Sequence, residues 1–242
     1  MGKIRIHRLL RRHAGIRPYL PSTALCTGAS LRSYLHRYPA VYIKPDGGGR
    51  GEGVVKVWRS GNTYRYVKVR GRPRTAQSVD ALSRMLGLRR RYHIVQRAID
   101  LARVQGRPFD IRVMMMRDTD RRWTVIGMTA KVAGSGSVIT NVARGKGYVL
   151  PVETALRRSL GLTDGEIAAK KQEMVRLAAM CTSVCDRVRR EWQIGYDLAV
   201  DRRGQVWFIE MNPRVPAHSL FRKQPQVYRR IKELAAFHRK RG

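Results

Sequence analysis

Two carboxylates and one amide near the C-terminal end of the sequence have the types and spacing to bind a divalent cation. Asp197 lies in the segment GYDLAV, and Glu210 and Asn212 lie in QVWFIEMN, with the turn formers of residues 201–204 between the segments. Side chains two residues apart on a strand project to the same face, so Glu210 and Asn212 point together. If the segments pair as a hairpin, Asp197 lies opposite them. Oxygen ligands without histidine or thiolate suit Mg²⁺, with Mn²⁺ as the alternative ion.

The same acids have a second interpretation, because 50 Lys and Arg residues surround the 17 Asp and Glu residues of this sequence. In so basic a chain, carboxylates often pair with nearby arginines and bind no metal. The spacing of Asp197, Glu210 and Asn212 does not decide between a metal site and ion pairs.

Residues 44–53 read KPDGGGRGEG and offer a second place for chemistry, one that suits a phosphate. Glycine lets backbone N–H groups approach an anion closely, and Lys44 could meet a phosphate as a point charge. The stretch is not a GxxxxGK[ST] loop, because no Lys-Ser or Lys-Thr follows the glycines. A plain hairpin needs one or two glycines, whereas residues 47–53 hold five. A flexible loop that closes over a triphosphate is the better interpretation.

The net charge of the chain indicates the class of partner. The formal charge is +33 over 242 residues, which repels itself unless an anionic partner or counterions screen it. An acidic peptide or protein, an anionic polymer and nucleic acid would each satisfy this charge. Aromatic residues make up only 7% of the chain and rarely alternate with basic ones, so nucleic acid is not favoured.

The cysteines and the apolar runs indicate the compartment. Cys26, Cys181 and Cys185 form no CxxC pair, which argues against a disulfide framework or a zinc site and fits a reducing cytoplasm. No apolar run approaches the ~20 residues that span a bilayer, and the start MGKIRIHRLLRRHAG lacks the apolar region of a signal peptide. We therefore expect a soluble, cytoplasmic protein without a membrane partner.

The elements that would position these residues are short strands and a few helices. Residues 1–38 are basic and irregular, so we expect an arm with a short helix and little independent core. β-branched and aromatic runs between turn formers predict strands at residues 40–45, 53–58, 63–69, 92–99, 108–116, 122–132, 195–200 and 205–212. Periodic apolar residues predict helices at residues 75–88, 165–193 and 225–242.

In their order along the chain, these pieces resemble an ATP-grasp ligase. A Lys44-Pro45 strand, a glycine-rich loop, the strand YHIVQRAI, the strand FDIRV and an Asn-bearing loop precede the two acidic strands. The thirteen-residue step from Asp197 to Glu210 resembles the metal-binding hairpin of D-alanine–D-alanine ligases and biotin carboxylase. FDIRV, GSVITN and WFIEMN are most similar to the bacterial YheC/YheD group, which is associated with endospore formers. The resemblance covers residues 40 to about 220.

The resemblance implies an α+β ATP-grasp fold, in which two α+β subdomains grip ATP between antiparallel sheets. Its expected parts are a basic N-terminal arm (1–38), a lid-bearing subdomain (39–98), a C-terminal subdomain with the magnesium site (99–224) and a basic C-terminal helix (225–242). About 40 residues precede the lysine strand, so the N-terminal domain of other members is expected to be absent or much reduced. The substrate site would then be built from the arm, a second subunit in a homo-oligomer, or a partner.

The resemblance also implies roles for individual residues. Arg112, Arg144 and Arg214 would face phosphate, substrate carboxylate or the acyl intermediate as catalytic residues, while Asp197, Glu210 and Asn212 would hold magnesium. Arg97 stands where the family often has glutamate. The residues expected to bind ATP are Lys44, Gly48, Gly49, Gly51, Gly53, Lys68, Gln96, Arg97, Ala98, Ile99, Lys131 and Asn141.

The implied reaction is the ATP- and Mg²⁺-dependent joining of a carboxylate to an amine or another nucleophile, through an acyl phosphate and with release of ADP. The positive charge suggests that the carboxylate belongs to an acidic peptide, protein or polymer. The alternative is a protein that keeps an ATP-grasp shell without turnover and binds nucleic acid or spore components. The likeness to YheC and YheD places the protein in the bacterial cytoplasm with a spore association.

Overall fold

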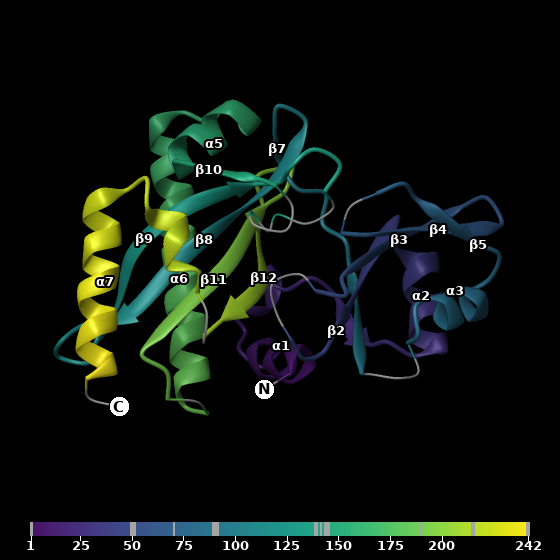
Figure 1. Ribbon diagram of the computed structural model, residues 1–242, viewed down its shortest axis with the longest axis horizontal. Coiled ribbons are helices and arrows are strands. Elements are labelled where there is room, and N and C mark those ends of the chain that lie inside the picture. Colours follow the sequence, from purple (N-terminus) through teal and green to yellow (C-terminus); the bar gives the residue numbers. More distant parts are fainter. Residues whose placement is uncertain are drawn as a thin grey trace. The chain divides into compact units, whose positions relative to one another are not determined.

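The computed structural model describes residues 2–48, 52–69, 71–88, 92–137, 140, 142, 146–188, 190–213 and 216–240. The chain divides into two compact units, each built on a mainly antiparallel sheet with helices (Figure 1). Unit 1 comprises the described residues within Met1–Arg8, Pro21–Asp100 and Ala133–Gly147. Unit 2 comprises those within Leu9–Leu20, Leu101–Val132 and Tyr148–Gly242. The α+β class and the antiparallel sheets confirm the predicted fold class.

The sheet of unit 1 has the strand order β1-β6-β2-β3-β4-β5, and every neighbouring pair is antiparallel. In β2 the fully buried Val41 and Ile43 alternate with half-buried residues, which is the pattern of a sheet with one covered face. The strands are β1 (Thr23–Leu25), β2 (Ala40–Pro45), β3 (Val55–Ser60), β4 (Thr63–Lys68), β5 (Arg74–Ala76) and β6 (His93–Arg97).

Helices α2 (Gly28–Arg37) and α3 (Val79–Met85) cover that face of the sheet. The Thr27 side chain accepts the Ser30 N–H and the Ser30 side chain accepts the Thr27 N–H, so a capping box begins α2. The buried side chains of both helices join those of β2 to β6 in one core cluster. By strand alternation, Tyr42, Lys44 and Gln96 project to the opposite face.

Residues 1–38 hold more regular structure than the irregular arm that the sequence predicted. Helix α1 (Lys3–Arg11), the short 3-10 helix η1 (Arg17–Tyr19), β1 and α2 all lie in this segment. Leu31 and Leu35, one turn apart on α2, are buried in the core of unit 1, and Leu10 and Ile16 are fully buried. Basic residues separate these apolar positions, so the helical spacing was not recognised in the sequence.

The sheet of unit 2 has the strand order β10-β9-β8-β11-β12, with β7 paired to β8. The hairpin expected of the two acidic segments is confirmed, since β11 pairs antiparallel with β12, and β8 pairs antiparallel with β9. The strands are β7 (Arg103–Val104), β8 (Arg107–Arg117), β9 (Trp123–Val132), β10 (Tyr148–Leu150), β11 (Gln193–Val200) and β12 (Val206–Asn212).

Helices cover both faces of this sheet. Met114 and Met116 of β8 pack against η2 (His218–Phe221) and α7 (Pro225–Arg239) on one face. Helix α6 (Asp164–Asp186) lies on the other face, where Arg117 of β8 contacts Asp186 of the helix. Helix α5 (Val152–Leu160) precedes α6 and ends at Gly161, which has a left-handed backbone (φ +67°).

Helix α6 ends seven residues before the predicted position, at Asp186 rather than residue 193. Val188, within the predicted range, lies beyond the helix and is 51% exposed. The helix stops because β11 begins at Gln193 and the intervening residues must return the chain to the sheet.

Two further expectations concern the helices and the cysteines. Within the described residues, none of the helices combines the length and the apolar composition that a membrane crossing requires. Cys26, Cys181 and Cys185 are free thiols, the latter two buried. Burial raises the pKa of Cys26 and of Cys185 to about 11, so these thiols are protonated at neutral pH.

Candidate functional site

The acidic residues of β11 and β12 face each other as the sequence predicts. Asp197 pairs with Glu210 and Gly195 pairs with Asn212 in the register of the two strands. Directly opposite residues of an antiparallel pair project to the same face, so Asp197, Glu210 and Asn212 share one face of the sheet. The predicted juxtaposition of two carboxylates and an amide is therefore confirmed.

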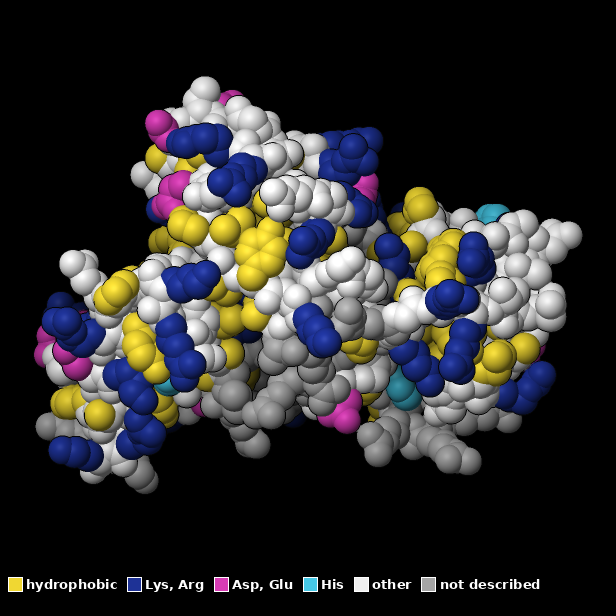
Figure 2. Space-filling view, turned by 45° about the horizontal axis from the view of Figure 1, so that its top comes forward, with side chains coloured by type: hydrophobic (Ala, Val, Ile, Leu, Met, Phe, Trp, Pro, Cys, Tyr) yellow, Lys and Arg dark blue, Asp and Glu magenta, His cyan; other side chains and the backbone are white. Residues whose placement is uncertain are grey.

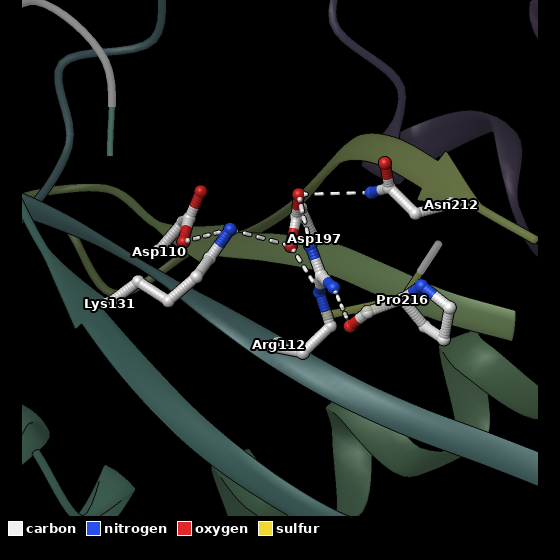
Figure 3. Close-up of polar contacts among 6 residues, drawn as sticks. All are labelled: Asp110, Arg112, Lys131, Asp197, Asn212 and Pro216. Carbon is white, nitrogen blue, oxygen red and sulfur yellow. Dashed lines mark hydrogen bonds and ion pairs between the residues drawn. The ribbon is translucent and has the colours of Figure 1, made fainter. Parts of the chain in front are cut away.

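Asp197 also contacts two cations and the amide of Asn212 (Figure 3). Arg112, opposite Asp197 on β8, donates from Nε to Oδ1 at 2.7 Å and from Nη2 to Oδ2 at 3.1 Å. Lys131 Nζ donates to Oδ1 at 2.7 Å, and Asn212 Nδ2 donates to Oδ2 at 3.2 Å. The ion-pair interpretation of Asp197 thus describes the contacts of this carboxylate in the structure.

Lys131 links Asp197 to a second acid, Asp110, whose Oδ1 lies 3.1 Å from Nζ. Asp110 and Arg112 are two residues apart on β8, and Asp110 pairs with Lys131 of β9. All four charged side chains are buried, with exposed fractions of 3 to 6% for the residues. They form a buried cluster in which each carboxylate touches a cation and each cation touches a carboxylate.

The electrostatics of this cluster keep Asp197 ionised. Burial alone would raise the pKa of Asp197, but the Arg112 guanidinium and the Lys131 ammonium outweigh it and hold this pKa well below its usual range. Burial likewise lowers the pKa of Arg112, while Asp197, Asp110 and Glu210 raise it, with a net upward shift. Arg112 and Asp197 therefore remain charged at any physiological pH.

Arg112 ties the cluster to the chain beyond β12. Its Nη1 donates to the carbonyl oxygen of Pro216. The Arg112 guanidinium and Pro216 both lie close to Gly195, since a Cβ on that residue would lie 2.9 Å from Arg112 Nη1 and 3.0 Å from Pro216 Cβ. Gly195 leaves room for the guanidinium to lie across β11, which explains a glycine within this strand.

The donor set fits a divalent cation that is bound together with an anionic ligand. The carboxylates of Asp197, Asp110 and Glu210 all act on Arg112 and raise its pKa. Within the described ranges, no group of three or more His, Cys, Asp and Glu side chains could hold a metal by itself. A metal here would depend on Glu210, Asp197, the Asn212 carbonyl and oxygens of a ligand.

In unit 1, Lys44 lies at the start of a short chain of hydrogen bonds. Its Nζ donates to Gln96 Oε1 at 2.7 Å, and Gln96 Nε2 donates to Thr23 Oγ1 at 2.9 Å. The three residues come from neighbouring strands, β2, β6 and β1. The buried Gln96 thereby fixes the position of the Lys44 ammonium on the face of the sheet opposite to α2 and α3.

The backbone of the segment YHIVQRAI, which holds four of the residues expected to bind ATP, forms hydrogen bonds within the sheet. The N–H of Arg97 donates to Ser22 O at 2.9 Å, and the N–H of Ala98 donates to Ala40 O at 3.0 Å. The Arg97 guanidinium lies 5.7 Å from the centre of the Tyr38 ring. Ala98 and Ile99 are half-buried, and their contact with an adenine stays a prediction.

The described part of the glycine-rich stretch is held by hydrogen bonds at its start and is closely packed at its end. Asp46 Oδ1 accepts the N–H of Ile4 at 2.8 Å, and Lys3 Nζ donates to Gly48 O at 3.0 Å. Gly53 has a φ of +69°, and a Cβ there would lie 2.7 Å from Pro45 Cγ. The loop therefore begins against α1 and ends against Pro45.

The structure does not bring every predicted residue together. Lys68 pairs with Val55, whose side chain is in the core under α2 and α3, so Lys68 follows the face opposite to that of Lys44. Lys56 pairs with Tyr42 and shares the Lys44 face. Gly49, Gly51, Asn141, Arg144 and Arg214 lie outside the described residues.

The sequence analysis did not identify four residues whose positions matter for the candidate site. Asp110 could have been found, since it stands two residues before Arg112 on a predicted strand and must share its face. Thr23, Lys56 and Gly195 carry no local signal, because their roles follow from the strand register and from close packing.

Comparison with known proteins agrees with the resemblance seen in the sequence. The family model described as "YheC/D like ATP-grasp" matches residues 1–237. The chain is 27% identical over 234 residues to the endospore coat-associated protein YheD of Bacillus subtilis (strain 168), covering 91% of this chain and 49% of that protein. It is 21% identical over 229 residues to YheC of the same organism, covering 90% of this chain and 60% of YheC.

A solved structure supports the fold. N5-carboxyaminoimidazole synthetase from Staphylococcus aureus, complexed with ADP, is similar with a TM-score of 0.56 and 11% sequence identity, over 88% of this chain and 44% of that one. The chain spans about half the length of the curated relatives that it matches. The comparisons therefore establish the family and the fold of the matched region.

Proposed function

Because the chain belongs to the YheC/D-like ATP-grasp family, we propose that it is an ATP- and Mg²⁺-dependent ligase that joins a carboxylate to an amine or another nucleophile through an acyl phosphate. The observation that carries the proposal is the pairing of Asp197 with Glu210 beside Asn212, with Arg112 and Lys131 in contact with Asp197. Oxygen donors for a hard cation and nitrogen donors for phosphate oxygens meet on one face of the sheet.

In this proposal Glu210, Asp197 and Asn212 hold the magnesium ion. When bound, the ion would neutralise negative charge on the transferring phosphoryl group. The register of β11 and β12 supports this assignment, because it sets Asp197 opposite Glu210 and Gly195 opposite Asn212.

Among the hydrogen bonds of the described residues, the cations of the cluster leave donors for a phosphate or an acyl oxygen. An ammonium has three N–H donors, and Lys131 donates one to Asp197 while its contact with Asp110 at 3.1 Å is an ion pair. A guanidinium has five, and Arg112 uses three for Asp197 and Pro216. The remaining donors of these fixed side chains are preorganised to stabilise negative charge as it develops in the reaction.

In unit 1, we assign phosphate binding to Lys44, held in place by Gln96 at 2.7 Å. The glycine-rich loop, of which Gly48 and Gly53 are described, would close over the nucleotide and keep water from the acyl phosphate. Arg97, Ala98 and Ile99 would line the adenine pocket. Loop closure and adenine binding are parts of the proposal that nucleotide titration can test.

The proposed carboxylate substrate is an acidic peptide or protein. The formal charge of +33 supports this class, and dark blue Lys and Arg side chains dominate over magenta Asp and Glu on the visible surface (Figure 2). Long-range attraction of an acidic chain is screened by salt, with a Debye length of about 8 Å at 0.15 M. The apparent affinity for the substrate should therefore fall as the salt concentration rises.

The test is release of ADP from Mg-ATP in the presence of acidic peptides and amines, followed by mass spectrometry of the products. We expect Lys44→Ala and Glu210→Ala each to lower the rate by about 100-fold, because loss of one fixed charge at a phosphoryl-transfer site costs several kcal/mol. Lys232→Ala and Glu233→Ala remove exposed charges of α7 and should leave the rate unchanged.

The products distinguish the rival functions. A new amide together with ADP supports ligation. A stable phosphorylated product would instead indicate phosphoryl transfer without ligation. If the protein binds ATP but releases no ADP with any of the substrates tested, a non-catalytic ATP-grasp shell is favoured. Equal activity of all four variants would contradict the assignment of Lys44 and Glu210 to the catalytic site.

A further inference from the structure

Helix α7 and the residues at its two ends carry a row of exposed positive charge. Residues 222–240 hold seven Lys and Arg residues against one acid, Glu233, so this segment is strongly basic. Dark blue side chains gather along the left side of Figure 2, where Figure 1 draws α7. The exposed cations, called the basic row below, are Arg222, Lys223, Arg229, Arg230, Lys232, Arg239 and Lys240.

The buried side of α7 fixes the direction in which the basic row points. The apolar side chains of the helix, Ile231 and Leu234 among them, pack against Met114 and Met116 of β8. At 3.6 residues per turn, Arg229 and Lys240 lie on the opposite side of the helix from Ile231 and Leu234. The basic row therefore points away from the sheet that carries the Asp197 cluster.

Contacts at both ends hold α7 in place. Gln224 Nε2 donates to Met128 O of β9 at 3.0 Å just before the helix, and His238 Nε2 donates to Arg117 O of β8 at 2.8 Å in the last turn. The His238 ring also stacks on Trp192, with the ring centres 5.3 Å apart. The cations thus project from a helix that is fixed to the sheet and about 22 Å long, at 1.5 Å per residue.

Acidic side chains neutralise little of the charge of the basic row. Glu233 contacts Arg230 at 3.6 Å, with about half of each side chain exposed. Within the part of the chain that the structure describes, Arg229 and Lys240 contact no carboxylate. Like charges on one helix face repel one another, so a partner that brings negative charge to this face would be stabilised there.

The shape of this surface favours a partner with a groove. An exposed helix is convex and about 10–12 Å across, and the major groove of B-form DNA is about 12 Å wide and admits an α-helix. The major groove of duplex RNA is deep and narrow, so side chains do not reach into it. Tyr228 and Phe237 are half-buried, so the outer face of α7 offers no exposed ring on which single-stranded bases could stack.

We propose that the outer face of α7 binds double-stranded DNA, with the helix along the major groove and the cations of the basic row on the phosphates. Phosphate contacts carry no sequence information, so this binding does not depend on the DNA sequence. The scarcity of aromatic residues argues against a single-strand platform and has no bearing on a duplex. The proposal goes beyond the ligase function and is independent of it, because the basic row shares no residue with the Asp197 cluster.

The test is fluorescence anisotropy of a labelled duplex DNA with the full chain at several salt concentrations. The logarithm of the binding constant falls linearly with the logarithm of the salt concentration, with a slope of about −0.9 for each phosphate neutralised. Arg229→Gln combined with Lys240→Gln removes two cations of the row, and glutamine keeps the helix propensity. We expect the slope to become shallower by about 1.8 and the affinity to fall by about tenfold or more.

Arg158→Gln combined with Arg176→Gln is the matched control. It removes the same charge from exposed positions on α5 and α6, in the same unit. Helix α6 lies on the other face of the sheet from α7, so this change leaves the basic row intact. We expect the slope and the affinity for DNA to match those of the parent chain.

Two further probes test the choice of partner. Duplex RNA of the same sequence and poly-L-glutamate should each bind at least about tenfold more weakly than the DNA. Equal binding of either probe would overturn the proposal, because the surface would then accept any chain of negative charge. The proposal is also overturned if the parent chain does not bind the DNA, or if the control changes the slope as much as the α7 variant does, because binding would then reflect the net charge of the whole chain.

Discussion

Arg112 and Asp197 lie opposite each other on β8 and β11, and the guanidinium donates to both carboxylate oxygens at 2.7 and 3.1 Å. Only 5% of Arg112 and 6% of Asp197 is exposed, so both charges have lost their hydration. Further hydrogen bonds, from Lys131 to Asp197 and from Arg112 to the Pro216 carbonyl, help to offset this loss. The stability of unit 2 and the chemistry of the candidate site therefore depend on the same contacts.

Asp197→Asn should destabilise unit 2 strongly. The amide keeps the shape of the side chain but removes one negative charge from the buried cluster, so Arg112 and Lys131 lose the carboxylate that both contact. Breaking a buried ion pair by removing one partner costs about 3–5 kcal/mol of the free energy of unfolding. Urea unfolding followed by circular dichroism measures this loss.

Glu233→Gln is the matched control for that change. Glu233 pairs with Arg230 at 3.6 Å on α7, in the same unit, with about half of each side chain exposed. Exposed pairs contribute at most about 1 kcal/mol. Equal losses in the two variants would contradict the importance that we assign to the buried cluster.

The dependence of stability on pH follows from the lowered pKa of Asp197. Arg112 and Lys131 hold the folded-state pKa of this carboxyl below the value of about 3.9 in an unfolded chain. A group with a depressed folded pKa stabilises the protein above its unfolded pKa, and this contribution is lost as the pH falls toward the folded value. The free-energy difference between the parent chain and Asp197→Asn should thus be constant from pH 7 to about 5 and shrink below about pH 4. A difference that grows on acidification would contradict this sign.

The hairpin that carries the acids could be predicted because its determinants are local. The turn formers of residues 201–204 and the alternation along QVWFIEMN indicate both strands, whereas the pairing of Asp197 with Glu210 also needs the register shift between Asp197 and Leu198. The FDIRV strand was predicted for the same reason. Each of these signals lies within about ten residues of the side chain that it positions.

The contacts among strands depend on non-local packing and could not be predicted in this way. The pairing of Asp110 with Lys131 requires the register of β8 and β9, which shifts at the irregularity between Met114 and Met115. The hydrogen bond of Thr23 to Gln96 joins residues 73 positions apart. A one-residue change of register would reverse the faces of these side chains, and no local pattern selects between the alternatives.

Gly195→Ala should destabilise the chain although alanine suits most strands better than glycine. The new Cβ would lie 2.9 Å from Arg112 Nη1 and 3.0 Å from Pro216 Cβ, so the guanidinium or the chain at Pro216 must move. Overpacking of this kind costs about 1–3 kcal/mol. Gly165→Ala is the control, because a Cβ added there would meet open space among the described residues and its place in α6 favours alanine. Thermal unfolding should rank the parent chain between the two variants.

Asp46→Ala should loosen both the start of α1 and the start of the glycine-rich loop. Gly2 precedes α1 and has no side chain, so the Asp46 carboxylate, 42 positions away from Ile4, accepts the helical N–H of that residue at 2.8 Å. Loss of an acceptor at a helix N-terminus costs about 0.5–2 kcal/mol. Asparagine serves as well as aspartate in this role, so Asp46→Asn should restore most of the stability.

Amide hydrogen exchange measures this coupling directly. We expect Asp46→Ala to raise the exchange rate at Ile4 and at Gly48, whose carbonyl accepts from Lys3 Nζ at 3.0 Å. Because α1 then holds the loop less firmly, the affinity for ATP should fall while Asp46→Asn keeps it. Faster exchange at Ile4 in both variants would show that the charge of Asp46, and not its oxygen as an acceptor, secures the helix to the loop.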